Sequence, residues 1–222
     1  MNQELSSDLH IHSTYSLDSI LFPQLIVRLA KFKGLGAIAI TDHDTIKGGL
    51  QTRMISDNEL LVIVGCEVKT DFGDLIGLFL NEDIRSRRFE DVLDEIEDQG
   101  GLAVLPHPYR RKLFPPDNLL KRLDLIEGLN GRTSLELNQR GLMLAKSLGK
   151  PVIAGSDAHN PFEVGIAKVI MEDSRNADEE LFRKKLVNGY ASASYADLPP
   201  ALRNASIFFG YAMKKIRNIR NI

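Results

Sequence analysis

The stretch PQLIVRLAKFKGLGAIAITDHD, residues 23–44, decides the fold that the sequence predicts. Pro23 opens a helix with apolar residues at helical spacing, and Gly34 ends it. The apolar run 37–40 follows and is typical of a buried strand. The polar cluster 41–44 comes directly after this strand. This stretch therefore predicts a helix, a strand and a group of polar side chains at the end of the strand.

The same alternation continues along the chain. We expect further strands at 60–64, 75–80, 102–105, 123–126, 152–154 and 167–171, and helices that end near Gly100, Gly149 and Gly189. Alternating strands and helices build parallel sheets. Polar clusters follow at least five of the strands, which favours a barrel over an open sheet with one switch point. Since 222 residues are fewer than the roughly 250 of a full eight-fold barrel, an irregular or trimmed β/α barrel is expected.

Bulk properties exclude several classes of protein. A hydrophobic content of 43% in 222 residues suits one sizeable core, and the net charge of −2 gives no general attraction to nucleic acid or lipid. No apolar run approaches the ~20 residues of a membrane helix. The single cysteine, Cys66, fits a reducing compartment. These features predict a cytoplasmic protein without a membrane partner, and they leave the oligomeric state open.

All five histidines lie in short clusters that end or follow apolar runs. They are His10, His12, His43, His107 and His159, and three of them have an aspartate within two residues. Histidine is the commonest metal ligand, and carboxylates are its usual companions in metal sites. The sequence therefore predicts a metal centre.

Spacing within the clusters supports this prediction. Side chains two apart in a strand share a face, so His10 and His12 point the same way, as do Asp157 and His159. The ligands expected from position are His10, His12, Asp18, His43, Glu67, His107, Asp157 and His159. Because one ion takes about four to six ligands, eight imply two or three divalent ions, which we expect to be manganese, iron or zinc. Asp42 and Asp44 are expected to orient imidazoles from behind.

These motifs, in order, resemble those of the PHP (polymerase and histidinol phosphatase) domain. The matching segments are Asp8-Leu9-His10-Ile11-His12-Ser13, Thr41-Asp42-His43-Asp44, Gly65-Cys66-Glu67, Pro106-His107-Pro108 and Gly155-Ser156-Asp157-Ala158-His159. The resemblance covers about residues 8 to 172. It implies a distorted (β/α)7 TIM-like barrel with parallel strands, up to three metal ions at the C-terminal ends of the strands, and phosphoester hydrolysis.

The resemblance also implies roles for individual residues. Glu67 would bridge two ions. His10, His12 and Asp157 would hold one ion, His107 would help to hold the second, and Asp18, His43 and His159 would hold the third. Many relatives carry a histidine where this chain has Asp74, and an aspartate there favours manganese or iron over zinc. A further histidine of some relatives has no match, and Glu127 and Asn130 lie nearest.

The expected reaction is hydrolysis of a phosphate ester by a metal-bridging hydroxide, with Glu67, Asp157 and His159 at the catalytic centre. The substrate is expected to be a small phosphorylated molecule, such as a nucleotide, sugar or amino-acid phosphate. Arg110, Arg111 and Arg132 are the candidates for gripping the phosphate. The group that protonates the leaving oxygen stays open between a metal-bound water and His159.

Other functions remain as alternatives. A nuclease or phosphodiesterase acting on nucleic acid is less favoured, because the chain is nearly neutral and has no basic stripe with aromatic residues. A non-catalytic regulatory domain stabilised by metals is a second alternative, although structural sites seldom need eight ligands. Hydrolysis of a carbon–nitrogen bond is a third, and Glu67 in the bridging position favours phosphate chemistry instead.

The C-terminal residues differ from the rest in composition. We expect residues 1–192 to form the barrel and residues 193–222 to form a helix packed on it with a basic tail. The apolar positions of this helix would be Leu202, Ala205, Phe209, Ala212, Met213 and Ile216, and its basic end Lys214, Lys215, Arg217 and Arg220. Cations near a helix C-terminus are favourable in themselves, so a solvated tail is preferred over a contact with a partner.

Overall fold

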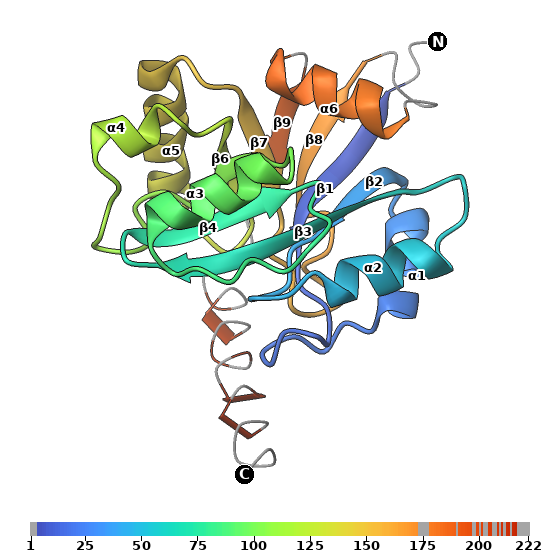
Figure 1. Cartoon of the computed structure of the whole chain (residues 1–222). Helices are drawn as coiled ribbons and strands as arrows, with labels where there is room; N and C mark the ends of the chain where they lie inside the picture. The colour runs from blue at the N-terminus through green and yellow to red at the C-terminus, as the bar shows by residue number, and fades with distance from the viewer. Residues whose placement is uncertain are drawn as a thin grey trace.

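The computed structural model describes residues 4–172, 178–189 and 191–196, with individual positions between 199 and 216. Strands and helices alternate along this part of the chain (Figure 1). The strands are β1 Leu5–Ile11, β2 Leu35–Ile40, β3 Leu61–Thr70, β4 Gly73–Leu78, β5 Leu102–Leu105, β6 Leu125–Asn130, β7 Val152–Gly155, β8 Ala167–Met171 and β9 Ser192–Tyr195. The helices are α1 Pro23–Phe32, α2 Lys47–Ile55, α3 Phe89–Asp98, α4 Asp117–Leu120, α5 Leu135–Leu148 and α6 Glu179–Val187.

These strands form one sheet in the order β7-β6-β5-β4-β3-β2-β1-β8-β9. Strand β4 is antiparallel to β3 and β5, and β8 is antiparallel to β1 and β9. The other neighbours pair in parallel, so most strands run in one direction. The predicted α/β barrel class is confirmed. Its detail differs because only residues 71 and 72 separate β3 from β4, which is enough for a hairpin and far too short for a helical crossover.

Hydrogen bonds join β1 to the segment after β7, the strand at one edge of the sheet. The Asp157 amide donates to the His10 carbonyl oxygen at 2.7 Å, and the His12 amide donates to the Ala158 carbonyl oxygen at 2.9 Å. The buried Asp8 carboxylate accepts from the Ser156 amide at 2.8 Å. Burial raises the pKa of Asp8 to about 6 in spite of its hydrogen bonds. The sheet is therefore a nearly closed barrel.

The interior of the barrel is apolar over most of its length. One buried cluster takes side chains from β1 to β8, with Ala193 and Tyr195 of β9 packed against it. Phe182 and Leu186 of α6 belong to the same cluster. Because residues from every strand meet there, we identify this cluster as the interior, with α6 covering one end.

A bulge in β1 changes which side chains face this interior. The pairing of β1 with β2 shifts between Asp8 and Ile11. Leu9 therefore lies in the interior cluster, whereas Ile11 packs with Ile26 and Ala30 of α1 on the outside. Strict alternation would have placed Leu9 and Ile11 on the same face, and the bulge separates them.

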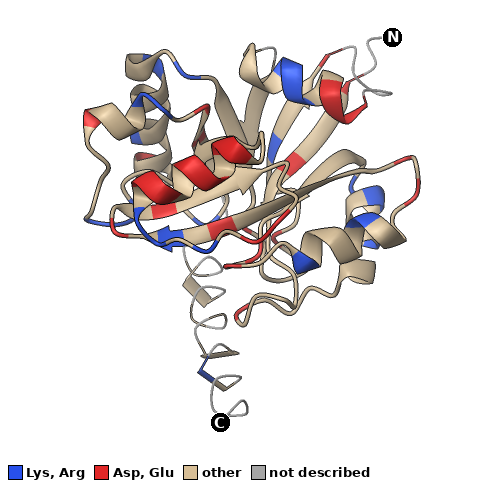
Figure 2. Ribbon diagram, in the orientation of Figure 1, with Lys and Arg blue, Asp and Glu red and all other residues tan. Residues whose placement is uncertain are grey.

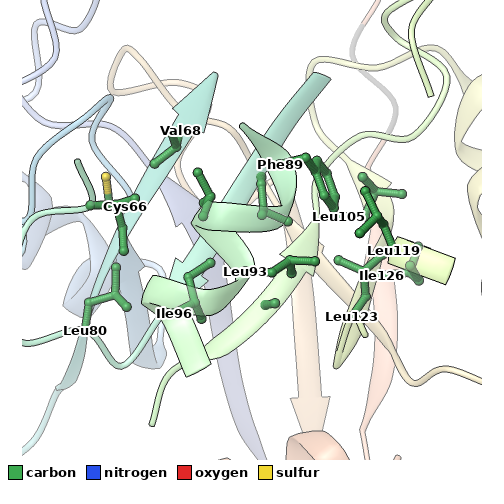
Figure 3. Close-up of a cluster of buried hydrophobic side chains, with 14 of the residues drawn as sticks. Cys66, Val68, Leu80, Phe89, Leu93, Ile96, Leu105, Leu119, Leu123 and Ile126 are labelled. Carbon is green, nitrogen blue, oxygen red and sulfur yellow. The ribbon is translucent and has the colours of Figure 1, made fainter. Parts of the chain in front are cut away.

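A second large cluster lies on the outside of the barrel (Figure 3). Phe89, Leu93 and Ile96 of α3 pack there against side chains of β3 to β6. Cys66 belongs to this cluster and is fully buried, facing away from the end of the barrel where Glu67 lies. Burial raises the pKa of its thiol. Cys66 is therefore an inert cysteine of the core, in agreement with the alternation of side chains along the strand.

The local sequence explains most of the element ends. Pro23 occupies the first turn of α1, and Gly149 ends α5 in the left-handed conformation with φ of 62°. Helix α2 was not predicted, because Gly48 and Gly49 in its first turn are poor helix formers. Strand β9 was not predicted either, and its pairing with β8 extends the sheet to Tyr195.

The C-terminal helix is described only in part. Ala205, Ala212, Met213, Lys215 and Ile216 are helical, whereas Leu202, Phe209, Lys214, Arg217 and Arg220 lie outside the described residues. Figure 2 shows charged residues of both signs distributed along the ribbon, with acidic residues along α3. Within the described ranges, no helix combines the length and the apolar character needed to span a bilayer.

Candidate metal centre

The predicted ligands come from six separate segments and meet at the C-terminal end of the barrel. His10 is in β1, and His12 and Asp18 follow it; His43 follows β2, Glu67 is in β3, Asp74 in β4, His107 follows β5, and Asp157 and His159 follow β7. His10 and His12 are completely buried, and their ring centroids lie 5.1 Å apart. The structure thus brings together side chains that are up to about 150 residues apart in sequence.

Glu67 lies at the centre of this group. Its Oε1 atom is 2.9 Å from His107 Nε2. Its Oε2 atom is 3.3 Å from His12 Nε2 and 3.6 Å from His10 Nε2. His43 Nδ1 also lies 3.3 Å from Oε2. The two oxygens therefore face different histidines, which is the arrangement that a carboxylate shared by two ions requires.

Asp157 closes one side of the group. Its Oδ1 atom is 3.5 Å from His12 Nε2 and 3.5 Å from His159 Nδ1. Asp157 has φ of 56° and His107 has φ of 31°. Residues other than glycine rarely adopt positive backbone φ angles of this kind. Gly155, two residues before Asp157, has no room for a side chain, because a Cβ there would lie 2.2 Å from the Cβ of His10. The backbone is thus constrained where the side chains converge.

Asp18 lies on the opposite side, between two imidazoles. Its Oδ2 atom is 3.5 Å from His43 Nε2, and its Oδ1 atom is 3.5 Å from His159 Nε2. The loop after β1 therefore brings this carboxylate back over the end of the barrel, as the sequence predicts. His12 joins the two sides, since its ring centroid is 4.3 Å from that of His159 and 4.6 Å from that of His43.

The donor atoms fit metal ions. Three groups each offer three nitrogen or oxygen ligand atoms that lie within 4.8 Å of one another, namely His10–His12–Glu67, Glu67–Asp74–His107 and His12–His43–His159. Atoms at such spacing can all reach one ion at bond lengths of about 2 Å. The groups overlap at Glu67 and His12. A fourth group combines His10 and His107 with Glu127.

The electrostatics at this end of the barrel favour a cation. Burial opposes the charge on Glu67, but His10, His107 and His12 hold the pKa of its carboxyl well below the usual range. Burial likewise opposes ionisation of Asp157, and Arg110 with His10 lowers its pKa. Burial would lower the pKa of His12, yet hydrogen bonds to Asp157 and Glu67 raise it to about 9. The carboxylates of Glu67 and Asp157 therefore stay ionised. Their negative charge favours a proton on His12 when no other cation is present.

His159 behaves in the opposite way. Burial, together with the nearby charges of His12 and Arg132, lowers its pKa to about 4. Arg132 Nη1 lies 2.7 Å from His159 Nδ1, and the Asp157 carbonyl oxygen lies 2.8 Å from the same nitrogen. A neutral imidazole is the form that binds a metal ion.

Glu127 is a buried residue of β6 that was not among the predicted ligands. It lies near the position where some relatives carry a further histidine. Its Oε1 atom is 2.9 Å from His10 Nδ1, and its Oε2 atom accepts a hydrogen bond from the His107 amide at 2.8 Å. The Asn130 side chain donates to Oε2 at 3.0 Å. Glu127 thus fixes His10 and His107 from behind. The signal in the sequence was a charged residue inside an otherwise apolar strand.

Asp42 and Asp44 were both expected to orient imidazoles. Asp44 does not, because its carboxylate is half-exposed and pairs with Arg87 at 3.2 Å. Asp42 is fully buried and accepts hydrogen bonds from the Ser13 amide at 2.6 Å and from the Ser16 hydroxyl at 2.9 Å. Asp42 therefore reaches an imidazole only through a serine.

All three predicted phosphate-binding arginines contact candidate ligands. Arg110 Nη1 is 2.7 Å from Asp157 Oδ2, and its Nη2 is 2.7 Å from the Thr133 hydroxyl. Arg111 Nε is 2.6 Å from Asp74 Oδ2. Arg132 contacts His159, as described above, and its Nε is 3.6 Å from Glu163. Arg110 and Arg132 lie on the Asp157 side of the group and Arg111 on the Asp74 side.

Gly210, one of the described positions near the C-terminus, lies at the same end of the barrel. Gly210 is buried, and a Cβ at this position would lie 3.4 Å from the Asp18 carbonyl oxygen and 3.6 Å from Arg132 Nη2. Fold and side chains together define a β/α-barrel protein with a candidate metal centre at one end.

Comparison with known proteins gives the family. The PHP domain model matches residues 8–138, and a model described as PHP-associated matches residues 136–190. The chain is 32% identical over 193 residues to the uncharacterized protein MJ0417 of Methanocaldococcus jannaschii, covering 82% of this chain and 77% of that protein. The uncharacterized protein MJ1587 of the same organism is 43% identical over 117 residues, which are 47% of this chain and 68% of that protein. This chain belongs to the PHP family.

A solved structure shows the same fold. A two-domain protein from Bacteroides vulgatus, described as containing a predicted PHP-like metal-dependent phosphoesterase, matches with a TM-score of 0.73 at 20% identity. The match covers 87% of this chain and 65% of that one. Family membership and the groups of donor atoms together support metal-dependent hydrolysis.

Proposed function

We propose that this protein hydrolyses the phosphate ester of a small molecule, such as a nucleotide, sugar or amino-acid phosphate, with two or three divalent ions. One observation carries the proposal: the Glu67 carboxylate lies within 3.6 Å of nitrogens from His10, His12, His43 and His107. A buried carboxylate among so many imidazoles would be costly without a cation to share. Manganese, iron and zinc all accept such ligands.

Each ion would be held by a different group of ligands. His10, His12, Glu67 and Asp157 would hold one ion, Glu67, Asp74 and His107 a second, and Asp18, His43 and His159 a third. Bound divalent ions supply charge neutralisation at the phosphoryl oxygens and an activated water nucleophile. Asp74 adds an anionic oxygen to the second group, which favours manganese or iron there.

Arg110 and Arg132 are the residues that best suit the phosphate. Both guanidinium groups lie beside Asp157, with Nη1 atoms 2.7 and 3.9 Å from its carboxylate. Guanidinium groups bind phosphate in a planar, bidentate manner. The side-chain Oδ1 atom of Asn130 and the Thr133 hydroxyl accept hydrogen bonds from Arg110 and so hold its guanidinium in place. Arg111, paired with Asp74, is the weaker candidate.

Accessibility favours a small substrate. His10 and His12 are completely buried, whereas the side chains of His43 and Arg110 are each 32% exposed. Approach is therefore on the side of His43 and Arg110, with Gly210 close to Asp18 at the same end. A terminal phosphate can enter such a site more easily than a phosphodiester inside a long polymer.

The test is a metal analysis of protein prepared without oxygen, followed by a phosphate-release screen. The screen uses sugar, amino-acid and nucleotide phosphates with manganese, iron and zinc, and single-stranded oligonucleotides as competing substrates. Glu67→Gln is the inactive reference. Release of phosphate from monoesters by the wild type alone supports the proposal.

Two other outcomes would contradict it. Cleavage of oligonucleotides without release from monoesters would assign a nuclease or phosphodiesterase. Bound metal that raises the unfolding temperature, with no hydrolysis of any substrate, would assign a metal-stabilised regulatory domain.

A further inference from the structure

Ser16 occupies a central position behind the metal centre. It lies in the loop after β1 and is 1% exposed. Its hydroxyl oxygen is 2.9 Å from Asp42 Oδ1 and 3.1 Å from His12 Nδ1, and the His43 amide donates to it at 2.9 Å. One hydroxyl thus connects a buried carboxylate with two of the candidate ligand residues.

The chemistry of these partners determines where the protons lie. A hydroxyl has one proton to donate and two lone pairs that accept. A carboxylate can only accept, so the Ser16 proton points to Asp42. The His43 amide can only donate. His12 Nδ1 must then carry a proton and donate it to the Ser16 oxygen. An unprotonated Nδ1 would point its lone pair at a lone pair of this oxygen, and the two would repel each other.

In the neutral form of His12, this assignment leaves the other ring nitrogen without a proton. Nε2 points into the candidate metal centre, 3.3 Å from Glu67 and 3.1 Å from His10 Nε2. A neutral imidazole with its proton on Nδ1 presents its lone pair at Nε2. The alternative tautomer would place a proton where an ion has to bind.

Asp42 is itself held firmly. The Ser13 amide and hydroxyl each donate to it at 2.6 Å. The start of α2 packs directly on its carboxylate, because a Cβ on Gly48 would lie 1.9 Å from Asp42 Oδ2. Asp42 cannot move without displacing Ser13 or the helix, so it gives Ser16 a fixed acceptor.

His10 is held in a different way. Its Nδ1 atom meets the Glu127 carboxylate directly at 2.9 Å. His12 uses a serine between the imidazole and the carboxylate, and this serine also binds the backbone of His43. A change at Ser16 therefore affects the group that contains His10, His12 and Glu67 and the group that contains His12, His43 and His159.

We propose that Ser16 and Asp42 are positioning residues that hold His12 in the tautomer with Nε2 free for a metal ion. This inference rests on the proposed metal centre. Partners of this kind fix the orientation and the tautomer of ligating histidines, and their removal commonly weakens metal binding 10- to 100-fold. The distinguishing feature here is that one hydroxyl transmits the effect of Asp42 to two ligand groups.

The experiment compares Ser16→Ala and Ser16→Thr with Ser19→Ala as the matched control. Ser19 is a buried serine of the same loop, and its hydroxyl donates to the His12 carbonyl oxygen at 2.7 Å. Zinc and manganese affinities are measured by competition titration of metal-free protein. Nitrogen-15 NMR of the zinc-loaded protein, as a diamagnetic probe, locates the proton on the His12 ring.

We expect Ser16→Ala to weaken metal binding about 10- to 100-fold, and to expose the Nδ1 proton of His12 to fast exchange. Ser16→Thr keeps the hydroxyl and should restore both properties, and Ser19→Ala should bind metal as the wild type does. Wild-type affinity in Ser16→Ala with an unchanged ring proton would overturn the inference, as would equal weakening in both alanine variants. If the wild type binds no divalent ion, the proposed metal centre itself fails.

Discussion

The guanidinium of Arg110 lies 2.7 Å from the carboxylate of Asp157, although the two residues are 47 positions apart in sequence. This ion pair joins a residue proposed to bind phosphate to a residue proposed to bind metal. A side chain so placed can contact a phosphoryl oxygen beside the metal centre without a large movement. Arg111, its neighbour, points to Asp74 instead.

The first prediction concerns these two arginines. Arg110→Ala should raise KM for phosphorylated substrates about tenfold or more, because a charge-assisted contact to phosphate is lost. Arg111→Ala is the matched control and should change KM much less. Arg110→Lys should recover part of the loss. Steady-state kinetics with the best monoester measures all three variants, and unchanged KM in Arg110→Ala would remove this residue from the substrate site.

The second prediction concerns Glu67. Glu67→Gln should lower metal content and reduce kcat at least 100-fold, because an amide cannot replace a shared carboxylate as a ligand. Elemental analysis and phosphate release measure the two effects. Glu82→Gln, at an exposed position, serves as the control and should behave as the wild type. Full metal content with full activity in Glu67→Gln would contradict the central role of this residue.

The third prediction concerns pH. In the metal-free protein the pKa of His12 is raised to about 9, above the usual value of 6.5. Its charged form therefore stabilises the fold fully below about pH 6.5, and this stabilisation is lost as the pH rises through about 9, for a loss of roughly 1–3 kcal/mol. Urea denaturation of metal-free protein at pH 6, 7.5 and 9 should show this decline.

Metal binding should reverse the same proton equilibrium. Because an ion needs neutral imidazoles, its binding at pH 7.5 must release protons. Calorimetric titration in buffers with different ionisation enthalpies measures the number released. Binding without any proton release at this pH would show that His12 and His10 are already neutral, and the third prediction would be wrong.

The fourth prediction separates stability from function. Phe89 of α3 is fully buried in the outer cluster (Figure 3), and its ring meets that of Phe72 edge to face at 6.4 Å. Phe89→Ala should lower the free energy of unfolding by about 3–5 kcal/mol, with little change in metal affinity per folded molecule. Phe32→Ala, at a residue 87% exposed, should change it by less than about 0.5 kcal/mol. Equal destabilisation by both variants would contradict the packing described for α3.

The fifth prediction concerns the entrance. Gly210→Ala should be tolerated, since its Cβ would be in ordinary contact with Asp18 and Arg132. Gly210→Phe should reduce kcat/KM, most strongly for the bulkier phosphorylated substrates, while metal content stays at the wild-type level. Ala205→Phe, at an exposed position, is the control. Unchanged kinetics in Gly210→Phe would place this residue away from the path of the substrate.

The sequence alone was enough to predict the barrel class and the residues that gather at its end. Apolar runs show where strands are buried, and ligands directly after strands must meet when the strands are parallel. The hairpin of β3 and β4, the antiparallel β8 and the bulge in β1 were not predictable in this way. They depend on pairing between distant strands, which leaves little trace in local composition.

What only the tertiary structure decided is which polar groups act on one another. Asp42 and Asp44 are two residues apart and chemically identical, yet one is buried against Ser16 and the other pairs with Arg87 on the surface. Likewise, Arg110 and Arg111 are neighbours that contact different carboxylates. Spacing along the chain determines the face from which a side chain leaves a strand, but its partner depends on segments folded from elsewhere. Hydrogen bonds and ion pairs act over only about 3–4 Å, and that proximity comes from packing.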